Sequence, residues 1–136
     1  MRTRQLLRGA KGFTLIEVLV VISLIFVLAG MALIQYQNSI RRSKEAVLKQ
    51  DLFRMRDAID QFYADKNKYP SSLEELVTEK YLRSIPQDPF TGSADTWQTV
   101  MSEPDPLNPS AMPGIYDVKS GSEETALDGT KYSEWE

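Results

Sequence analysis

Glu17 is the charged residue of clearest chemical interest, because it stands alone in an apolar stretch. Phe13 to Ile34 is a run of 22 residues in which Glu17 is the only charged side chain. A carboxylate in the middle of a membrane helix costs about 2.5–3.5 kcal/mol on insertion scales. Attraction to the N-terminal end of its own helix, worth about 0.3–1 kcal/mol, is too weak to explain a charge placed so deep. Glu17 is therefore a candidate functional residue.

The composition excludes most catalytic and metal-binding chemistry. The 136 residues include no His and no Cys, which excludes disulfides, zinc sites with nitrogen or sulfur ligands, and Ser-His or Cys-His catalysis. No Ser-Lys pair or catalytic carboxylate pair stands out, so we expect no enzyme. A metal could bind only through oxygen, which favours calcium or magnesium. The net charge of −3 argues against a general nucleic-acid binder.

The charges are distributed asymmetrically around the apolar run. Residues 1–12 carry four basic side chains and no acid, and the rest of the chain holds 12 basic and 19 acidic side chains. As a helix, the 22 apolar residues would be roughly 33 Å long, enough to cross a hydrocarbon core of about 30 Å. The positive-inside rule then keeps the basic segment in the cytoplasm and exports the acidic remainder.

A secretory signal peptide is the alternative interpretation of this N-terminus. It would have the basic start and the apolar centre, and Val27-Leu28-Ala29 loosely fits a cleavage site. Glu17 argues against it, and so does the absence of proline between Met1 and Lys68, because nothing there ends the helix. The residues alone leave both interpretations open.

A second helical segment, residues 35–66, is amphipathic. Its apolar positions are spaced 4, 3, 4 and 3 residues apart, which traces one face of a helix: Leu48, Leu52, Met55, Ile59 and Phe62. The opposite face is expected to carry Arg42, Lys49, Arg56, Asp57 and Asp60. One helix of about 54 residues could thus run from Phe13 to Lys66. A coiled coil would explain the stripe too, but the flanking charges are too irregular to favour it.

The remaining 70 residues read as short elements joined by loops. Lys68-Tyr69-Pro70 predicts that the long helix ends near Asn67. A short helix is expected over 72–80, with capping boxes of Ser71 with Glu74 and Ser72 with Glu75. Strands are expected over 97–101 and 114–119, and an irregular loop over 85–92. So short a segment buries a marginal core alone, and should pack on the helix stripe.

The segment Gly12-Phe13-Thr14-Leu15-Ile16-Glu17-Val18-Leu19-Val20 resembles the class III signal of type IV pilins and type II secretion pseudopilins. The features are a basic leader that ends in Gly, then Phe, then Glu four positions on. The rest of the chain is similar to the major pseudopilin of type II secretion, on Tyr69-Pro70, Tyr81-Leu82, Ile85-Pro86, Asp88-Pro89, Gly114 to Val118 and Ala126 to Trp135.

This resemblance implies an α+β fold, the pilin-like lollipop. One long N-terminal helix, with a membrane half and an amphipathic half, would pack on a small C-terminal domain that has a short helix and a small antiparallel sheet. The expected divisions are a cleaved leader (1–12), a transmembrane half-helix (13–34), an amphipathic half-helix (35–66) and a small periplasmic region (67–136).

The function implied by the resemblance is assembly. A prepilin peptidase would cut between Gly12 and Phe13, and Phe13 would become an N-methylated N-terminus. Glu17 would then pair with the Phe13 ammonium of a neighbouring subunit. The expected partners are further copies in a homo-polymer, other pseudopilins or minor pilins, the inner-membrane assembly platform and the membrane, but no nucleic acid.

The expected product is an inner-membrane protein that polymerises into a periplasmic pseudopilus for type II secretion. Two alternatives remain: a type IV pilin of a surface pilus, and a signal-peptide-bearing or membrane-anchored periplasmic binding protein. The cluster Arg41-Arg42-Ser43-Lys44 is expected either to form salt bridges with Glu45, Asp51 or Asp57 of neighbours, or to face solvent and lipid head groups.

Calcium is the cofactor that the resemblance suggests, because the major pseudopilin family binds it in a C-terminal loop. Asp128 resembles one of the family's ligands, and Ser122 and Glu123 could add oxygen atoms. Thr130 stands where a second acid is expected, and the spacing is not that of an EF-hand. The metal site is therefore an expectation with an incomplete ligand pattern.

Overall fold

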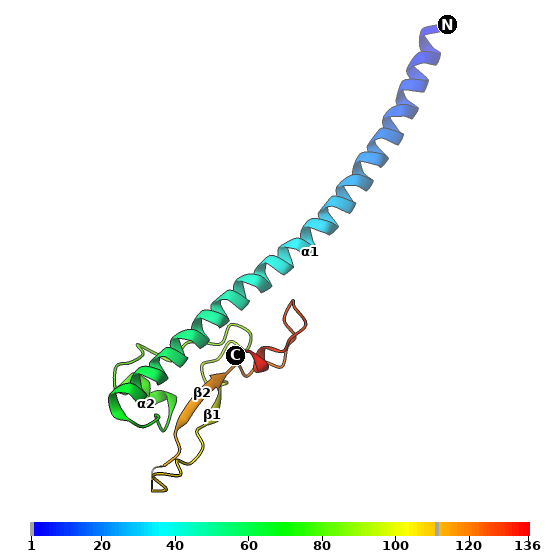
Figure 1. Cartoon of the computed structure of the whole chain (residues 1–136). Helices are drawn as coiled ribbons and strands as arrows, with labels where there is room; N and C mark the ends of the chain where they lie inside the picture. Colours follow the sequence, from blue (N-terminus) through cyan, green and yellow to red (C-terminus); the bar gives the residue numbers. More distant parts are fainter. Residues whose placement is uncertain (1, 111) are drawn as a thin grey trace. The chain divides into compact units, whose positions relative to one another are not determined.

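The computed structural model describes residues 2–110 and 112–136, and describes side chains from Thr14 onward within those ranges. The elements follow in the order α1 (Arg2–Lys66), α2 (Leu73–Thr78), β1 (Gln98–Met101), β2 (Ile115–Lys119) and the short 3-10 helix η1 (Tyr132–Glu134), as labelled in Figure 1. The chain divides into two compact units, residues 1–40 and 41–136. The expected α+β combination of one long helix, one short helix and a small antiparallel sheet is confirmed.

The first unit is helical and apolar. Leu15, Phe26 and Ile34 are 68%, 73% and 60% exposed, and the other large apolar side chains between them are exposed as well. Within the described residues, α1 is the one helix that is long and apolar enough to cross a membrane. Ser23, the one serine between Phe13 and Ile34, donates from Oγ to the Leu19 carbonyl at 2.8 Å, so this hydroxyl is satisfied by its own helix.

The second unit buries the predicted stripe of α1. Leu48, Leu52, Met55, Ile59 and Phe62 are each 2% exposed or less, which confirms the 4-3-4-3 reading. The side chains that join them in the core come from α2, β2, η1 and the connecting segments: Leu73, Leu76, Trp97, Ile115, Val118, Ala126 and Tyr132. The stripe is therefore covered by residues of its own chain.

The end of α1 lies where the sequence predicts it. Asn67 adopts a left-handed conformation with φ of 54°, and its N–H donates to the Tyr63 carbonyl at 2.8 Å. Asparagine tolerates this conformation better than most residues, and it ends a helix because the chain cannot continue in the right-handed form. Pro70 then follows in a buried position.

The start of α2 is capped by Ser72 with Glu75, as one of the two predicted pairs requires, and Glu75 makes further contacts with Ser71. Ser72 is the N-cap, and its Oγ accepts from the Glu75 N–H at 3.3 Å. The Glu75 carboxylate returns to the backbone N–H and the hydroxyl of Ser71, both at 2.7 Å. The expected box of Ser71 with Glu74 is therefore wrong. The helix is also shorter than predicted, because Lys80, with φ of 66°, lies beyond its end.

The two strands pair as an antiparallel sheet. Gln98 lies opposite Lys119 and Thr99 opposite Val118, and a bulge follows between Val100 and Met101. Each strand begins one residue later than predicted. Gly114, just before β2, passes so near the chain that a Cβ there would lie 2.6 Å from the Tyr69 carbonyl oxygen. Only glycine fits this approach, which lets Ile115 donate to the Pro70 carbonyl at 2.7 Å.

Candidate functional site

Glu17 lies in the exposed apolar part of α1. Glu17 is four positions after Phe13, a rise of about 6 Å or roughly one helical turn. The side chains of Gly12 and Phe13 fall outside the described residues, so leader cleavage, methylation and the pairing of Glu17 with Phe13 stay predictions. The structure places Glu17 among apolar neighbours on a surface that no other part of its own unit covers.

One residue of the basic cluster after the apolar segment binds within its own subunit. Arg41 donates from Nη1 to the Thr125 carbonyl at 3.0 Å, whereas Arg42 and Lys44 are exposed. Two of the three acids expected to pair with neighbouring subunits are committed or buried in their own chain. Glu45 accepts two hydrogen bonds from the C-terminal segment, and Asp51 is only 9% exposed. These contacts within the chain leave Glu45 and Asp51 less available to neighbours, and pairing between subunits stays a prediction.

Glu45 is a central contact of the second unit. Its Oε1 accepts from the Leu127 N–H at 3.0 Å and from the Tyr132 hydroxyl at 2.8 Å. Tyr132 is fully buried, and it stacks on Phe90 with 3.9 Å between ring centroids. Burial, and then the hydrogen bond to Glu45, raises the pKa of Tyr132 well above its usual range. The phenol thus stays a donor to Glu45 at every physiological pH.

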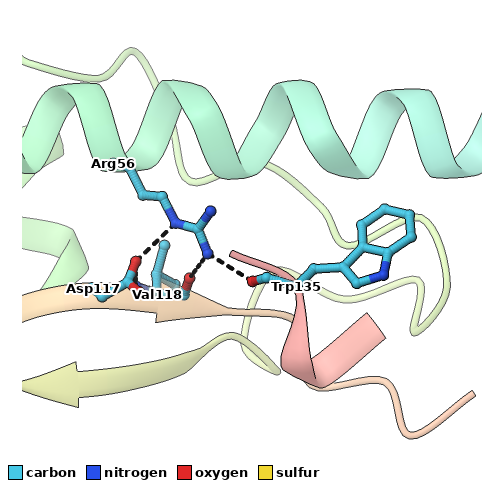
Figure 2. A network of polar contacts seen from close by, with 4 residues as sticks. All are labelled: Arg56, Asp117, Val118 and Trp135. Carbon is cyan, nitrogen blue, oxygen red and sulfur yellow. Dashed lines mark hydrogen bonds and ion pairs between the residues drawn. The ribbon is translucent and has the colours of Figure 1, made fainter. Parts of the chain in front are cut away.

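Arg56 connects α1 with β2 and with the C-terminal segment, as Figure 2 shows. Its Nε donates to Asp117 Oδ1 at 2.8 Å, and its Nη2 donates to the Val118 carbonyl at 3.1 Å and to the Trp135 carbonyl at 2.8 Å. The planar guanidinium can serve three acceptors at once because its donors point in fixed, different directions. The helical pattern predicted Arg56 on the face opposite the buried stripe, and this is wrong, because the side chain is half-buried and contacts β2 and the C-terminal segment.

Lys49 makes a second contact with the same segment. Its Nζ lies 5.0 Å from the centroid of the Trp135 ring, within the range of a cation–π interaction. The Trp135 indole N–H also donates to Thr130 Oγ1 at 2.8 Å. Lys49 is exposed, as the sequence predicts, yet it faces the C-terminal segment.

The three residues suggested for calcium lie in one segment but are directed to other partners. Asp128 Oδ1 accepts from Thr130 N–H at 3.0 Å and from Thr130 Oγ1 at 2.6 Å. Ser122 is buried and its Oγ accepts from the Glu124 N–H at 3.2 Å. Glu123 lies 3.8 Å from Lys131 Nζ. Within the described part of the chain, no three acidic side chains gather as a metal site, so these three residues do not form an acidic cluster.

The sequence pattern did not identify Glu45 and Arg56 as the residues of α1 that bind the C-terminal segment. A signal was present, because Arg41, Glu45 and Lys49 follow at intervals of four beside the buried stripe. Charged side chains at the edge of an apolar stripe can reach whatever covers that stripe. The partners of Arg41, Glu45 and Arg56 lie 84, 87 and 79 positions further along the chain. No periodic pattern in the sequence identifies these partners.

The chain matches a short sequence motif and is similar to several known proteins. Residues 7–33 match the prokaryotic N-terminal methylation motif. The chain is 31% identical over 99 residues to type II secretion system core protein G of Pseudomonas aeruginosa, covering 61% of this chain and 70% of that protein. It is 30% identical over 96 residues to core protein G of Pectobacterium carotovorum, covering 59% of this chain.

Fimbrial proteins are similar as well. The chain is 43% identical over 58 residues to the type IV major fimbrial protein FimA of Dichelobacter nodosus, covering 43% of this chain and 36% of that protein. No solved structure gives a significant match.

The extent of these matches differs among the relatives. The chain spans 62% of the length of the Pectobacterium protein and 70% of the Pseudomonas protein. The Pseudomonas match covers more of this chain than the 65 residues of α1 alone, so it includes the region that follows the helix. The apolar helix with its matched methylation motif anchors the protein in a membrane, and the chain belongs to the family of type II secretion system core protein G.

Proposed function

We propose that this protein is a structural filament subunit, a pseudopilin that polymerises from the inner membrane into a periplasmic pseudopilus and drives protein export by type II secretion. The observation that carries the proposal is the single carboxylate of Glu17. It lies in an exposed apolar helix, inside the matched methylation motif and four residues after Phe13.

The physical role of Glu17 follows from its cost in lipid. A lone carboxylate is unfavourable among apolar surroundings, and an ion pair with an ammonium group compensates it. Cleavage after Gly12 would create such an ammonium at Phe13. Because Glu17 is one helical turn from Phe13, pairing between subunits sets an axial offset of about 6 Å at that contact. Each added subunit would then satisfy the charge of the one before it.

The proposed setting is the inner membrane, with residues 1–12 in the cytoplasm before cleavage and residues 41–136 in the periplasm. The four basic side chains before the apolar helix support this orientation. The proposed partners are further copies of the chain, other pseudopilins or minor pilins, a prepilin peptidase and the assembly platform of the inner membrane. The proposed role is structural, with no catalytic residue.

A surface type IV pilus is the second candidate, and the match to FimA favours it. That match covers 43% of the chain, less than the share of α1, which has 65 of the 136 residues. The core protein G matches extend further, to 61% for the Pseudomonas relative. We therefore favour the secretion pseudopilus, because the C-terminal unit distinguishes one filament class from another.

The test is a comparison of Glu17→Leu with Ser23→Ala in cells that carry a type II secretion system. Glu17→Leu makes the helix more apolar, so membrane insertion should be kept. It leaves the Phe13 ammonium unpaired in the filament, which costs about 3–5 kcal/mol at each contact. Filaments seen by electron microscopy and exoprotein in the medium should both be lost.

Ser23→Ala is the matched control within the same apolar run, because the Ser23 hydroxyl bonds to its own helix. It should assemble and secrete as the unchanged protein does. Filaments formed by Glu17→Leu would contradict the proposed pairing. Filaments that extend from the cell surface without any effect on secretion would favour the surface pilus.

A further inference from the structure

We propose that the C-terminal loop, defined as residues 125–135, is held in place by side chains of α1 and keeps its structure without calcium. This goes beyond the proposed filament function, since it concerns what orders the subunit. The contacts that carry it all lie within the second unit.

The first two contacts come from Arg41 and Glu45. Arg41 donates to the Thr125 carbonyl, and Glu45 accepts from the Leu127 N–H and the Tyr132 hydroxyl. The two side chains are one helical turn apart, so they present a donor to the start of the loop and an acceptor to residues further along it. A metal ion would supply only positive charge at such a place, whereas α1 supplies both kinds of partner.

The other two contacts come from Lys49 and Arg56. Lys49 lies over the Trp135 ring, and Arg56 donates to the Trp135 carbonyl. Arg56 is fixed in turn by Asp117 of β2 at 2.8 Å, in an ion pair whose two side chains are about one quarter exposed. The far end of the loop is thus held by a cation that is itself positioned by the sheet.

The loop also closes on itself through its backbone. Ala126 donates to the Thr130 carbonyl at 2.6 Å, and Gly129 donates to the Ala126 carbonyl at 3.0 Å. Gly129 has φ of 90°, a conformation that glycine adopts without strain. Thr125 and Lys131 pair as an isolated antiparallel bridge. These bonds give the loop a defined turn that needs no ligand to close it.

One oxygen atom of each of the two candidate carboxylates, Asp128 Oδ1 and Glu123 Oε2, is engaged by groups of the chain. Both Thr130 donors bind Asp128 Oδ1, and these bonds, followed by the smaller effect of the Lys49 charge, lower the pKa of Asp128. Glu123 faces the ammonium of Lys131. Calcium takes six to eight oxygen ligands, and to bind Asp128 Oδ1 or Glu123 Oε2 it would have to displace bonds and a cation already present.

The first measurement is thermal unfolding of the full chain in detergent, with calcium chloride or with the chelator EGTA. We expect the same Tm in both. A bound ion stabilises the folded state by an amount that grows with the logarithm of its excess over Kd, which would appear as a Tm several degrees higher in calcium. Such a shift, if it disappears in Asp128→Asn, would overturn the proposal.

The second measurement is trypsin cleavage after Lys131, which lies on the exposed side of the loop. Glu45→Ala and Arg56→Ala should each speed this cleavage about tenfold, the factor that corresponds to about 1.4 kcal/mol, and added calcium should not slow it. Gln50→Ala, an exposed position on the same helix, is the matched control and should leave the rate unchanged.

Circular dichroism separates loss of the loop from loss of the fold, because α1 should keep its helical signal in every variant. The cleavage rate of the conservative variant Glu45→Gln should lie between the rates of the unchanged protein and of Glu45→Ala, since glutamine keeps an acceptor but loses the charge. The role of α1 would be contradicted if Glu45→Ala and Arg56→Ala left the cleavage rate unchanged. It would also be contradicted if added calcium restored the original rate in these variants.

Discussion

Asp88 and Ser120 form a fully buried hydrogen bond between segments 32 positions apart, with 2.5 Å between Asp88 Oδ2 and Ser120 Oγ. Asp88 also accepts the Phe90 N–H on Oδ1 at 2.9 Å, and Ser120 accepts the Ser122 N–H at 3.2 Å. This pair joins the loop after α2 to the end of β2, so one carboxylate sets the path of two segments.

Replacing Asp88 by Ala should therefore destabilise the second unit. It leaves the Ser120 hydroxyl and the Phe90 N–H without their acceptor, at about 1–3 kcal/mol for each buried group. We expect a loss of about 2–4 kcal/mol in the free energy of unfolding, measured by urea denaturation of the full chain in detergent. Asp95→Ala, at an exposed position, should stay within about 0.5 kcal/mol. Equal effects of the two changes would show that the buried pair contributes nothing specific.

Asp51 should make stability depend on pH in a defined direction. Its burial raises the pKa of its carboxyl; the charge of Arg54 opposes this and that of Asp88 adds to it. A folded-state pKa above the unfolded value of about 3.9 means that ionisation costs stability at neutral pH, and that the cost disappears as pH falls through the raised pKa. Asp51→Asn should thus raise the Tm at pH 7.

The difference in Tm between Asp51→Asn and the unchanged protein should shrink as the pH falls through the raised pKa of Asp51, because its carboxyl is then protonated. Thermal scans of the full chain between pH 4 and pH 8 measure it. A difference that stays constant over this range would indicate a packing effect of the amide and no contribution from ionisation.

Processing at the N-terminus is the next prediction. In a host with a prepilin peptidase, the intact mass should show loss of residues 1–12 and gain of one methyl group. Gly12→Leu should block the loss, because the residue before the cut would no longer be small. A mature N-terminus at Gly30 would instead support an ordinary signal peptide.

The membrane topology gives another independent prediction. Protease added to spheroplasts should digest residues 41–136 from outside, because the basic leader holds the N-terminus in the cytoplasm. Intact cells should protect the same residues behind the outer membrane. Protection in spheroplasts would reverse the proposed orientation.

Local patterns predicted much of the fold. The spacing of Leu48, Leu52 and Met55 identified the buried face of α1 because helical periodicity is a property of neighbouring residues. Asn67 and Pro70 marked the helix end for the same reason, and Ser72 marked the start of α2. Each of these signals acts over a few positions, where backbone geometry limits the choices.

Contacts between distant segments could not be predicted in this way. Arg56 looked like a solvent-facing residue because the helix pattern says nothing about a carbonyl 79 positions later. The same holds for Asp88 and Ser120, since their pairing depends on the route of the chain between them. Glu17 was identified early because its signal, a charge among apolar residues, needs no knowledge of any partner.

The long separation between α1 and the residues that cover it has a consequence for the kinetics of folding. Arg41, Glu45 and Arg56 reach partners 84, 87 and 79 positions further along the chain. Loops of this length close slowly, because the chain loses much entropy before the contacts compensate it. In the proposed export, the apolar stripe of α1 would emerge before residues 125–135, and part of it would lie uncovered for that interval. The subunit would be most prone to aggregation then, because transiently exposed apolar surface associates with other chains.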